Sequence, residues 1–326
     1  MRVGYQVFIA VSRELSVSKA AQQLHITQQC ASDHIRRLEK EFGVTLFERK
    51  PSFQLTTAGH VMLQSLQNMQ ILETNMRRNL TEVADGSRGS FTLGISTSRA
   101  PIILPRILPL YYHTFPDVNI SFIEEDTELL EARLLAGEID LFIGINTTPH
   151  PDYTIQTVSS EGIYLVISDS LLRQNFRSKE IETMWSGVDL NNFSHIPFTL
   201  SFRTGKVNHA IAEYLNTNNV QLKVTYNISD TKTQIQLCRT GICAALCPKM
   251  LLDTPYMSNI ARRQEEQLYA FPINHFDRNI HIDLVSHKNI PHPLYIQKFS
   301  RMLQDEILNI VYDDFFHIPP SLPDIW

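Results

Sequence analysis

The sequence predicts an α/β protein in three parts: a small winged helical domain, one long helix, and a larger domain of alternating strands and helices. Three observations lead to this fold class. Residues 3–42 contain three short segments with apolar side chains at helical spacing. Residues 58–85 keep one helical pattern, with no proline and no glycine after Gly59. Residues 91–144 alternate strand-like and helix-like segments, which predicts a parallel sheet with crossover helices.

Length and composition exclude several classes of protein. The 326 residues exceed one small domain, and 43% hydrophobic content supports sizeable cores. No run approaches the roughly 20 apolar residues of a membrane span, and the N-terminus lacks a signal-peptide pattern. We therefore expect a cytoplasmic protein. The four cysteines, Cys30, Cys238, Cys243 and Cys247, suggest no disulfide framework and contain no Cys-x-x-Cys pair.

Charge is divided unevenly along the chain. Residues 1–89 hold 11 Lys and Arg against 8 Asp and Glu, a net charge of +3. Residues 90–326 hold 18 against 26, a net charge of -8. A mildly basic N-terminal part on an acidic body indicates a nucleic-acid-binding module joined to a domain that does not touch phosphates.

The first helix is expected from Val3 to Arg13, and the second begins after a Ser16 N-cap. Ala20 and Ala21 are small enough to let another helix approach closely. Only two residues separate the second helix from Thr27, which caps the third. Two short helices joined by so tight a turn predict a helix-turn-helix. The alternative is a helical hairpin with no ligand.

The third helix, Thr27 to Phe42, has the pattern of a recognition helix. Its buried stripe is expected to consist of Ala31, Ile35, Leu38 and Phe42. The remaining face carries the polar side chains Gln28, Gln29, Ser32, Asp33 and Arg36. Amides and short polar groups at the N-terminal end suit contacts to base edges in the major groove.

A wing is expected after the Gly43 C-cap. Residues 44–49 and 53–55 predict two short strands around a tight connection. Arg49 and Lys50 lie at its tip, where they could reach phosphates or a minor groove.

The long helix carries apolar residues that alternate in steps of four and three, with one charged interruption: Met62, Leu66, Met69, Glu73, Met76, Leu80 and Val83. So long a stripe has no core of its own, so we expect it to be buried against a second copy of the chain. Packing onto its own body is the alternative. Gly86 to Ser90 would then form a hinge between modules.

Residues 5–60 resemble the winged helix-turn-helix of the LysR-type transcriptional regulators. The matching positions are Phe8, Ala20, Ala21, Leu24, Gln28, Ser32, Ile35, Leu38, Glu39, Gly43, Leu46, Phe47, Arg49, Leu55, Thr56, Ala58 and Gly59. The resemblance implies a transcription regulator that binds double-stranded DNA as a homodimer or homotetramer. In that role Gln28, Gln29, Ser32 and Arg36 would read the major groove, and Thr27, Arg49 and Lys50 would hold phosphates. Asp33 would either accept from a cytosine amine or repel phosphate.

The third part is similar to the family's effector-binding domain, which resembles the two-lobed periplasmic binding proteins. Its matching residues are Gly94, Leu104, Pro105, Phe115, Pro116, Val118, Leu130, Gly137, Ile139, Asp140 and Leu141. The resemblance implies these domain bounds: winged helix-turn-helix 1–57, linker helix 58–86, first lobe 90–163, second lobe 164–267, return to the first lobe 268–311, and a C-terminal extension 312–326.

Polar residues just past the strand ends predict an effector site. Hydroxyls and free backbone N–H groups there can hold a carboxylate, although a Ser or Thr after a strand is as often only a cap. A second-lobe loop resembles one that faces the cleft between the lobes. The expected effector-binding residues are Ser96, Thr97, Ser98, Arg99, Thr127, Ser201, Phe202, Arg203 and Thr204. The effector would be a small polar or anionic molecule.

Other chemistry finds little support in the sequence. Cys238, Cys243 and Cys247 match no structural zinc spacing, and their apolar neighbours indicate buried, unreactive thiols. No nucleophile elbow, phosphate-binding loop or dinucleotide motif occurs, so we expect no enzyme, cofactor or metal. Two rival hypotheses remain: a cytoplasmic enzyme or solute-binding protein whose helical head mediates protein contacts, and an effector domain that binds no ligand.

Overall fold

The computed structural model describes residues 2–48, 52–85, 89–201, 205–252, 257–260, 262–276, 280–288 and 290–312. The chain divides into two compact units. The first consists of Met1–Gly86 with Leu135–Glu138 and Ile290–His292, and the second contains the remainder.

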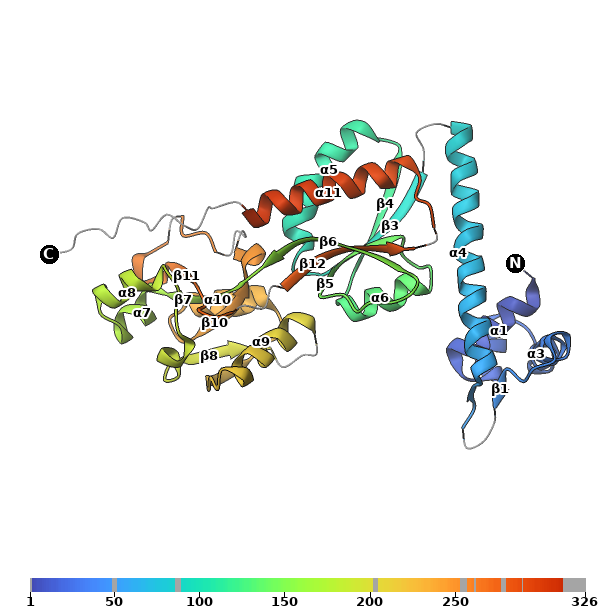
Figure 1. Ribbon diagram of the computed structural model, residues 1–326, viewed down its shortest axis with the longest axis horizontal. Helices are drawn as coiled ribbons and strands as arrows, with labels where there is room; N and C mark the ends of the chain where they lie inside the picture. The colour runs from blue at the N-terminus through green and yellow to red at the C-terminus, as the bar shows by residue number, and fades with distance from the viewer. Residues whose placement is uncertain are drawn as a thin grey trace. The chain divides into compact units, whose positions relative to one another are not determined.

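The first unit begins with three helices and a short wing, followed by one long helix (Figure 1). Its elements are α1 (Val3–Glu14), α2 (Val17–Gln23), α3 (Gln28–Phe42), β1 (Phe47–Glu48), β2 (Gln54–Leu55) and α4 (Thr57–Asp85). Local hydrogen bonds set the helix ends as expected. The Ser16 side chain accepts from the Lys19 N–H, and Gly43 adopts the left-handed conformation (φ 68°) and donates to Glu39 O.

The core of the first unit is made by the inner faces of its helices and the base of the wing. Ala20 and Ala21 are 0% and 2% exposed, which confirms the expected close approach of helices at these positions. The expected buried stripe of α3 is confirmed at Ala31, Ile35 and Leu38 and wrong at Phe42, which is 49% exposed. Helical spacing predicted that Phe42 would be buried. Phe42 is the last residue of the helix, so its side chain lies beyond the edge of the core.

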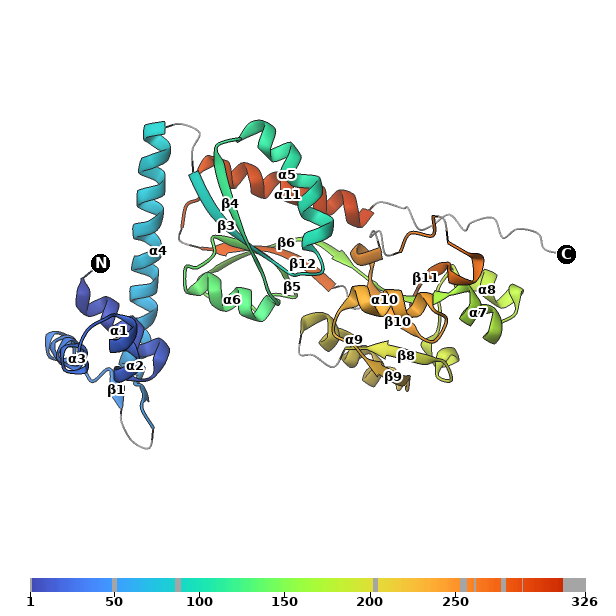
Figure 2. The ribbon, with the colours of Figure 1, turned by 180° about the vertical axis from the view of Figure 1, so that it is seen from behind.

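The second unit contains two five-stranded sheets, one in each lobe (Figures 1 and 2). The first sheet has the order β4-β3-β5-β12-β6, from strands β3 (Gly89–Ile95), β4 (Val118–Glu124), β5 (Leu141–Ile145), β6 (Tyr153–Glu161) and β12 (Ile280–His287). Its helices are α5 (Ala100–Thr114), α6 (Thr127–Leu135) and α11 (Leu294–Tyr312). Figures 1 and 2 show α5 and α11 over one face of this sheet and α6 over the other.

The sheet of the second lobe has the order β11-β7-β10-β8-β9. Its strands are β7 (Ile163–Ser168), β8 (Pro197–Leu200), β9 (Lys223–Asn227), β10 (Ala244–Pro248) and β11 (Leu268–Pro272). The helices are α7 (Asp169–Asn175), α8 (Ser178–Met184), α9 (Lys206–Thr217) and α10 (Thr231–Arg239), with 3-10 turns η1 (Leu190–Phe193), η2 (Lys249–Leu252) and η3 (Gln264–Glu266).

The expectation of a parallel sheet holds for part of the first lobe. Strands β3, β4 and β5 are parallel, whereas β12 pairs antiparallel with both β5 and β6. The reason is that β6 leaves for the second lobe and β12 returns from it, so neither belongs to a strand-helix-strand crossover. Strand β11 still pairs with β7 in the second lobe, so the return lies after Pro272 and not at the expected residue 268.

No helix within the described part of the chain is long and apolar enough to cross a membrane.

Candidate functional site

The N-terminal end of α3 presents polar side chains in two rows at i, i+4 spacing. Its N-cap, Thr27, accepts a hydrogen bond from the Cys30 N–H at 3.1 Å and so orders the first turn. One row consists of Gln28, Ser32 and Arg36, and the other of Gln29, Asp33 and Arg37. Both rows are exposed or half-buried along their length. A ridge of this kind can present donors and acceptors to base edges.

A shallow groove of about 250 Å³ follows the second row. It is lined by Thr27, Gln29, Cys30, Asp33, His34 and Arg37. The structure thus brings three of the predicted DNA-binding residues together with three that sequence reasoning missed. The missed Arg37 lies four residues after Asp33, so extending that row by one turn would have found it.

Two of the predicted DNA-contacting residues bind one another. Arg36 Nη1 lies 3.0 Å from Asp33 Oδ1, and the side chains are 68% and 42% exposed. An exposed pair of this kind contributes at most about 1 kcal/mol, so DNA phosphates can compete for the guanidinium. In the free protein the Arg36 side chain therefore lies against Asp33 on its own helix.

The wing is anchored at its base. Glu39 of α3 accepts a hydrogen bond from the Leu46 N–H at 2.9 Å, and Gln54 donates to Glu48 at 2.6 Å between the two strands. Arg49 and Lys50, predicted to hold phosphates from the tip, lie outside the described residues.

A cavity of about 500 Å³ lies between the two lobes of the second unit. Among its lining residues are six of the predicted effector-binding residues: Ser96, Thr97, Ser98, Arg99, Thr127 and Ser201. The other three, Phe202, Arg203 and Thr204, lie outside the described residues. The second lobe adds residues that the sequence did not single out, among them Lys206, Asp230 and Lys232.

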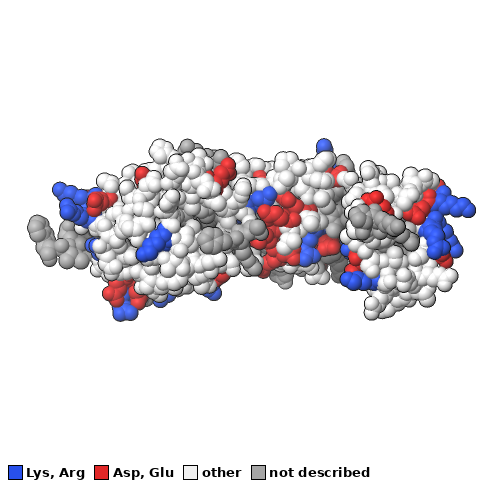
Figure 3. Space-filling model, turned by 90° about the horizontal axis from the view of Figure 1, so that it is seen from below, with Lys and Arg blue, Asp and Glu red and all other residues white. Residues whose placement is uncertain are grey.

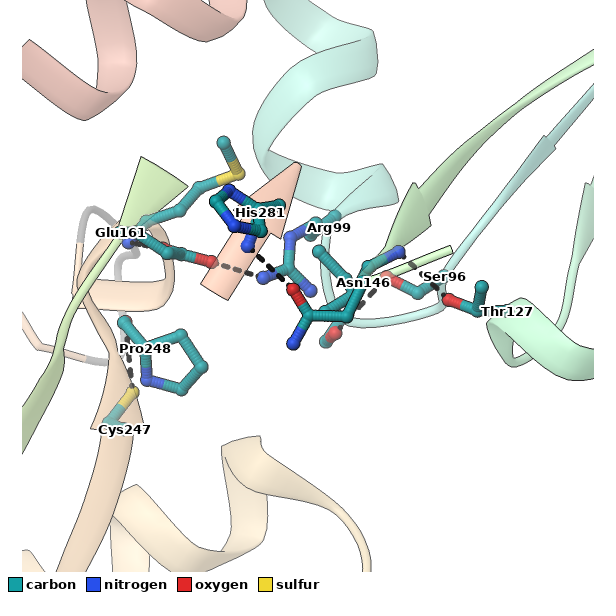
Figure 4. A network of polar contacts seen from close by, with 11 residues as sticks. Ser96, Arg99, Thr127, Asn146, Glu161, Cys247, Pro248 and His281 are labelled. Carbon is teal, nitrogen blue, oxygen red and sulfur yellow. Dashed lines mark hydrogen bonds and ion pairs between the residues drawn. The ribbon is translucent and has the colours of Figure 1, made fainter. Parts of the chain in front are cut away.

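Strand pairing explains why the first-lobe residues meet. Ile95 pairs with Glu124 on the neighbouring parallel strand, and the Glu125 N–H donates to Ile95 O at 3.1 Å. Both strands therefore end at the same level, and the segments 96–99 and 126–128 leave the sheet side by side. Figure 4 shows Ser96 and Thr127 close together at this edge. Ligands of open α/β sheets bind in this position.

Thr127 has a structural contact as well as a place in the cavity. Its hydroxyl oxygen accepts from the Ile145 N–H at 3.0 Å, and its side chain is buried. Ser96 Oγ and Ser98 Oγ lie 3.4 Å apart and share one hydrogen bond. The three hydroxyls thus line the first-lobe wall at the ends of adjacent strands.

Arg99 was expected to add a positive charge to the cleft, but most of that charge is compensated. Its side chain is buried and forms an ion pair with Glu161 (Figure 4). The other carboxylate oxygen of Glu161 accepts from the Met250 N–H of the second lobe at 2.6 Å. Arg99 Nε has no hydrogen-bond partner among the described residues. Arg99 therefore lines the cavity as one member of a buried ion pair.

The same pair joins the two lobes. Glu161 is the last residue of β6, and Gly162 alone separates it from β7 in the other lobe. The Lys249 N–H donates to Gly162 O at 3.0 Å, next to the bond that Met250 makes to Glu161. Sequence reasoning missed Glu161. The available signal was an acidic residue directly before Gly162, ahead of the segment expected to enter the second lobe.

A second contact crosses the mouth of the cleft. Lys206 Nζ, in the first turn of α9, donates to Thr148 Oγ1 of the first lobe at 2.8 Å. The Thr148 N–H in turn donates to Glu131 Oε1 at 2.8 Å. The cleft is thus tied at its hinge and at its mouth.

Asp230 is a charged group on the second-lobe wall. It caps α10, and the hydrogen bond from the Thr233 hydroxyl, with help from backbone N–H groups, lowers the pKa of its carboxyl. The carboxylate is therefore ionised at neutral pH.

The three cysteines of the second lobe are buried, as their neighbours predicted. Burial raises the pKa of Cys247 well above its usual range. The hydrogen bond between Cys238 and Cys243 raises the pKa of the first thiol and lowers that of the second. Within the described ranges, no group of three or more His, Cys, Asp or Glu side chains could hold a metal ion.

On the face drawn in Figure 3, a group of Asp and Glu side chains gathers on the second unit, while Lys and Arg side chains are distributed over several parts of the surface.

Two family models match this chain and together span most of it. Residues 4–60 match the bacterial regulatory helix-turn-helix protein, lysR family, and residues 84–307 match the LysR substrate binding domain. The chain belongs to the LysR family of transcriptional regulators. Its head is a helix-turn-helix of that family, and the curated relatives that it matches are named transcriptional regulators.

The relatives of this LysR-family regulator are distant. It is 26% identical to the "Probable RuBisCO transcriptional regulator" of Thalassiosira pseudonana over 249 residues, which covers 74% of this chain and 77% of the relative. It is 34% identical to the regulator AlsR of Bacillus subtilis over 164 residues, which cover 50% of this chain and 54% of AlsR. The match therefore spans about half of that relative.

Solved structures support the same fold. Full-length CbnR in complex with its target DNA matches with a TM-score of 0.55 at 19% identity, covering 93% of this chain and 98% of CbnR. At this level of identity the match concerns the fold alone.

Proposed function

We propose that this regulator binds operator DNA through α3 and that a small polar or anionic effector, held in the cleft between the lobes, modulates that binding. The DNA-binding part of this proposal rests on the exposed double row of polar side chains at the N-terminal end of α3. Gln28, Gln29, Ser32 and Arg36 read base edges, while Thr27, Arg49 and Lys50 hold phosphates. The protein acts in the cytoplasm, where its DNA lies.

The long helix α4 supports assembly as a homodimer or homotetramer. Met69, Met76 and Leu80 belong to the heptad pattern and are 51%, 54% and 63% exposed in the single chain. Leu72 beside them is 49% exposed. Apolar side chains exposed at this spacing are buried when two such helices pair, and the pairing then fixes the separation of the two reading heads.

The cleft supports the effector half of the proposal. Its first-lobe wall offers the Ser96 and Ser98 hydroxyls and the buried Arg99. The opposite wall of the cleft belongs to the second lobe. A ligand that contacts both walls therefore favours one angle between the two lobes. Binding would shift the population of lobe arrangements and, through the linker helices, the spacing of the heads along DNA.

DNA binding is tested by fluorescence anisotropy with duplexes from the region that flanks the protein's own gene. We expect log K to fall linearly with log salt concentration, with a slope of roughly -0.9 for each phosphate contact. A folded protein that binds no duplex in a salt-sensitive manner would contradict the DNA-binding half.

Effector binding is tested by thermal unfolding against a metabolite panel. A ligand at 100 times its dissociation constant should add about 2.7 kcal/mol to the free energy of unfolding. The double substitution Ser96→Ala with Ser98→Ala should reduce that gain, whereas Ser194→Ala, at an exposed position outside the cavity, should leave it unchanged. If no metabolite stabilises the protein, the domain acts as a constitutive assembly unit.

A further inference from the structure

The turn after β3 is built to receive an anionic group. The backbone N–H groups of Thr97 and Ser98 donate to no described residue, and both residues line the cavity. Arg99 follows them, 2% exposed, with only one of its guanidinium nitrogens engaged by a described residue, Glu161. Backbone amides, a hydroxyl and a guanidinium together match a carboxylate.

The adjoining segment carries the opposite charge. Asp126 and Glu128 line the same cavity, on either side of Thr127. Neither side chain has a hydrogen-bond or ion-pair partner among the residues that the structure describes, and both are exposed. Because β3 and β4 end at the same level, these carboxylates lie beside the 96–99 turn. They match an ammonium group placed next to a carboxylate.

The charge balance of this wall disfavours a ligand that is only anionic. Glu161 already compensates Arg99, so Asp126 and Glu128 leave the first-lobe wall with a negative excess. A second carboxylate placed at this wall would face like charges, which destabilises binding, while the second-lobe wall carries Lys206 and Lys232 together with Asp230. A ligand that carries one positive charge beside its negative charge meets complementary groups at both.

The rest of the cavity lining is mixed. Polar residues of the second lobe, among them Lys206, Asp230 and Lys232, lie beside aliphatic side chains from both lobes, which line part of the cavity: Ile145, Val207, Ile211, Ile235, Leu246 and Leu251. With a volume of about 500 Å³, the cavity has room for a small molecule with an uncharged side group.

We propose that the effector is an α-amino acid with an uncharged side chain, whose carboxylate binds the 96–99 turn, whose ammonium group binds Asp126 and Glu128, and whose side chain lies along the aliphatic wall. This inference rests on the proposed function, because it names the class of ligand for the same cleft.

The ligand side is tested by thermal unfolding and calorimetry of the full chain with the twenty L-amino acids. Each stabilising amino acid is then compared with three relatives: the acid that lacks the amino group, the N-acetyl derivative and the carboxamide. For leucine these are 4-methylpentanoate, N-acetyl-leucine and leucinamide. Loss of either charge should weaken binding about ten- to a hundred-fold, as expected for one hydrogen-bonded charged group.

The outcomes separate this inference from the proposed function. An acid without an amino group, or a dicarboxylate, that binds as tightly as any amino acid would overturn it and leave effector binding intact. If none of the twenty amino acids binds, the inference is also wrong, and the wider metabolite panel alone decides whether the cleft binds any effector.

The protein side is tested with Asp126→Asn combined with Glu128→Gln. The double variant should bind the amino acid about ten-fold or more weakly and bind the matched acid without an amino group at least as well as the parent chain. Asp305→Asn, an exposed acid on α11 outside the cavity, is the control for net charge. Equal weakening of both ligands would mean that the acids act on lobe closure, for example toward Lys206, and would overturn the inference.

Discussion

The ion pair between Asp33 and Arg36 decides what the exposed edge of α3 offers to DNA. The pair holds the guanidinium against its own helix, 3.0 Å from the carboxylate. Binding to phosphate or to a base edge requires Arg36 to leave Asp33, and the carboxylate then faces the negative charge of the duplex. Under the proposed function, we expect Asp33 to weaken binding to all sequences or, by accepting from one cytosine amine, to select a base.

We expect Asp33→Asn to tighten DNA binding at every sequence, by up to roughly five-fold, because an exposed pair is worth at most about 1 kcal/mol. Anisotropy titrations with the operator and with unrelated duplexes measure this, with Asp305→Asn as the control. If Asp33→Asn instead lowers the affinity only for duplexes that carry one particular base pair, Asp33 takes part in base recognition.

Gly59 has no room for a side chain. A Cβ at this position in α4 would lie 2.2 Å from the Leu46 carbonyl oxygen at the base of the wing. Gly59→Ala must therefore push the wing away from the helix, and we expect it to lower the free energy of unfolding by about 1–3 kcal/mol. Urea unfolding of the full chain measures the loss.

Gly4 provides the matched control in the same unit. A Cβ there would meet the Leu38 side chain at 3.7 Å, an ordinary contact, within α1. Gly4→Ala should stabilise the unit by up to about 1 kcal/mol, because alanine favours the helix. If both substitutions had the same effect, the close approach at Gly59 would not determine the packing of the wing.

At the scale of the elements, helix ends could be predicted because the signals that set them are local. Ser16, Thr27 and Gly43 each make a capping hydrogen bond within five residues along the chain. Glu161 could not be found in this way, since its partner Arg99 is 62 residues distant in sequence. The direction of β6 and β12 was equally hidden, because it depends on which lobe each strand leads to.

The exposed stripe of α4 leads to a prediction about assembly. Met76→Glu or Leu80→Glu places a charge in the middle of the expected helix pairing, where burying it without a partner is unfavourable. We expect dimers or tetramers to dissociate at concentrations where the parent chain is assembled, as measured by analytical ultracentrifugation. Glu substituted for Thr74, an exposed residue outside the heptad stripe, should leave assembly unchanged.

At the scale of the whole molecule, buried polar contacts join the two lobes of the body at the hinge. Arg99 belongs to the first lobe, Glu161 ends the strand that leaves it, and the Met250 N–H belongs to the second. Burying two charges is costly, so the pair is stable only while both members are present. A change at Glu161 should therefore affect the stability of the body and the angle between its lobes together.

We expect Glu161→Gln to lower the free energy of unfolding by about 3–5 kcal/mol, because it leaves the buried Arg99 charge uncompensated. Glu125→Gln, which breaks a partly exposed pair with Arg133 in the same lobe, should cost no more than about 1 kcal/mol. Replacing both members of the buried pair, with Arg99→Met and Glu161→Leu, should recover most of the loss while removing the bond to Met250.

Urea unfolding measures the stability of each variant. The angle between the lobes is measured by the distance between two spin labels, one at His113 and one at Asn216, which are exposed positions on the two lobes. These labelled proteins also carry Cys30→Ser. If the double variant recovers its stability and keeps the parent distance distribution, the pair stabilises the body but does not set the arrangement of the lobes. A broadened distribution would identify it as the contact that does.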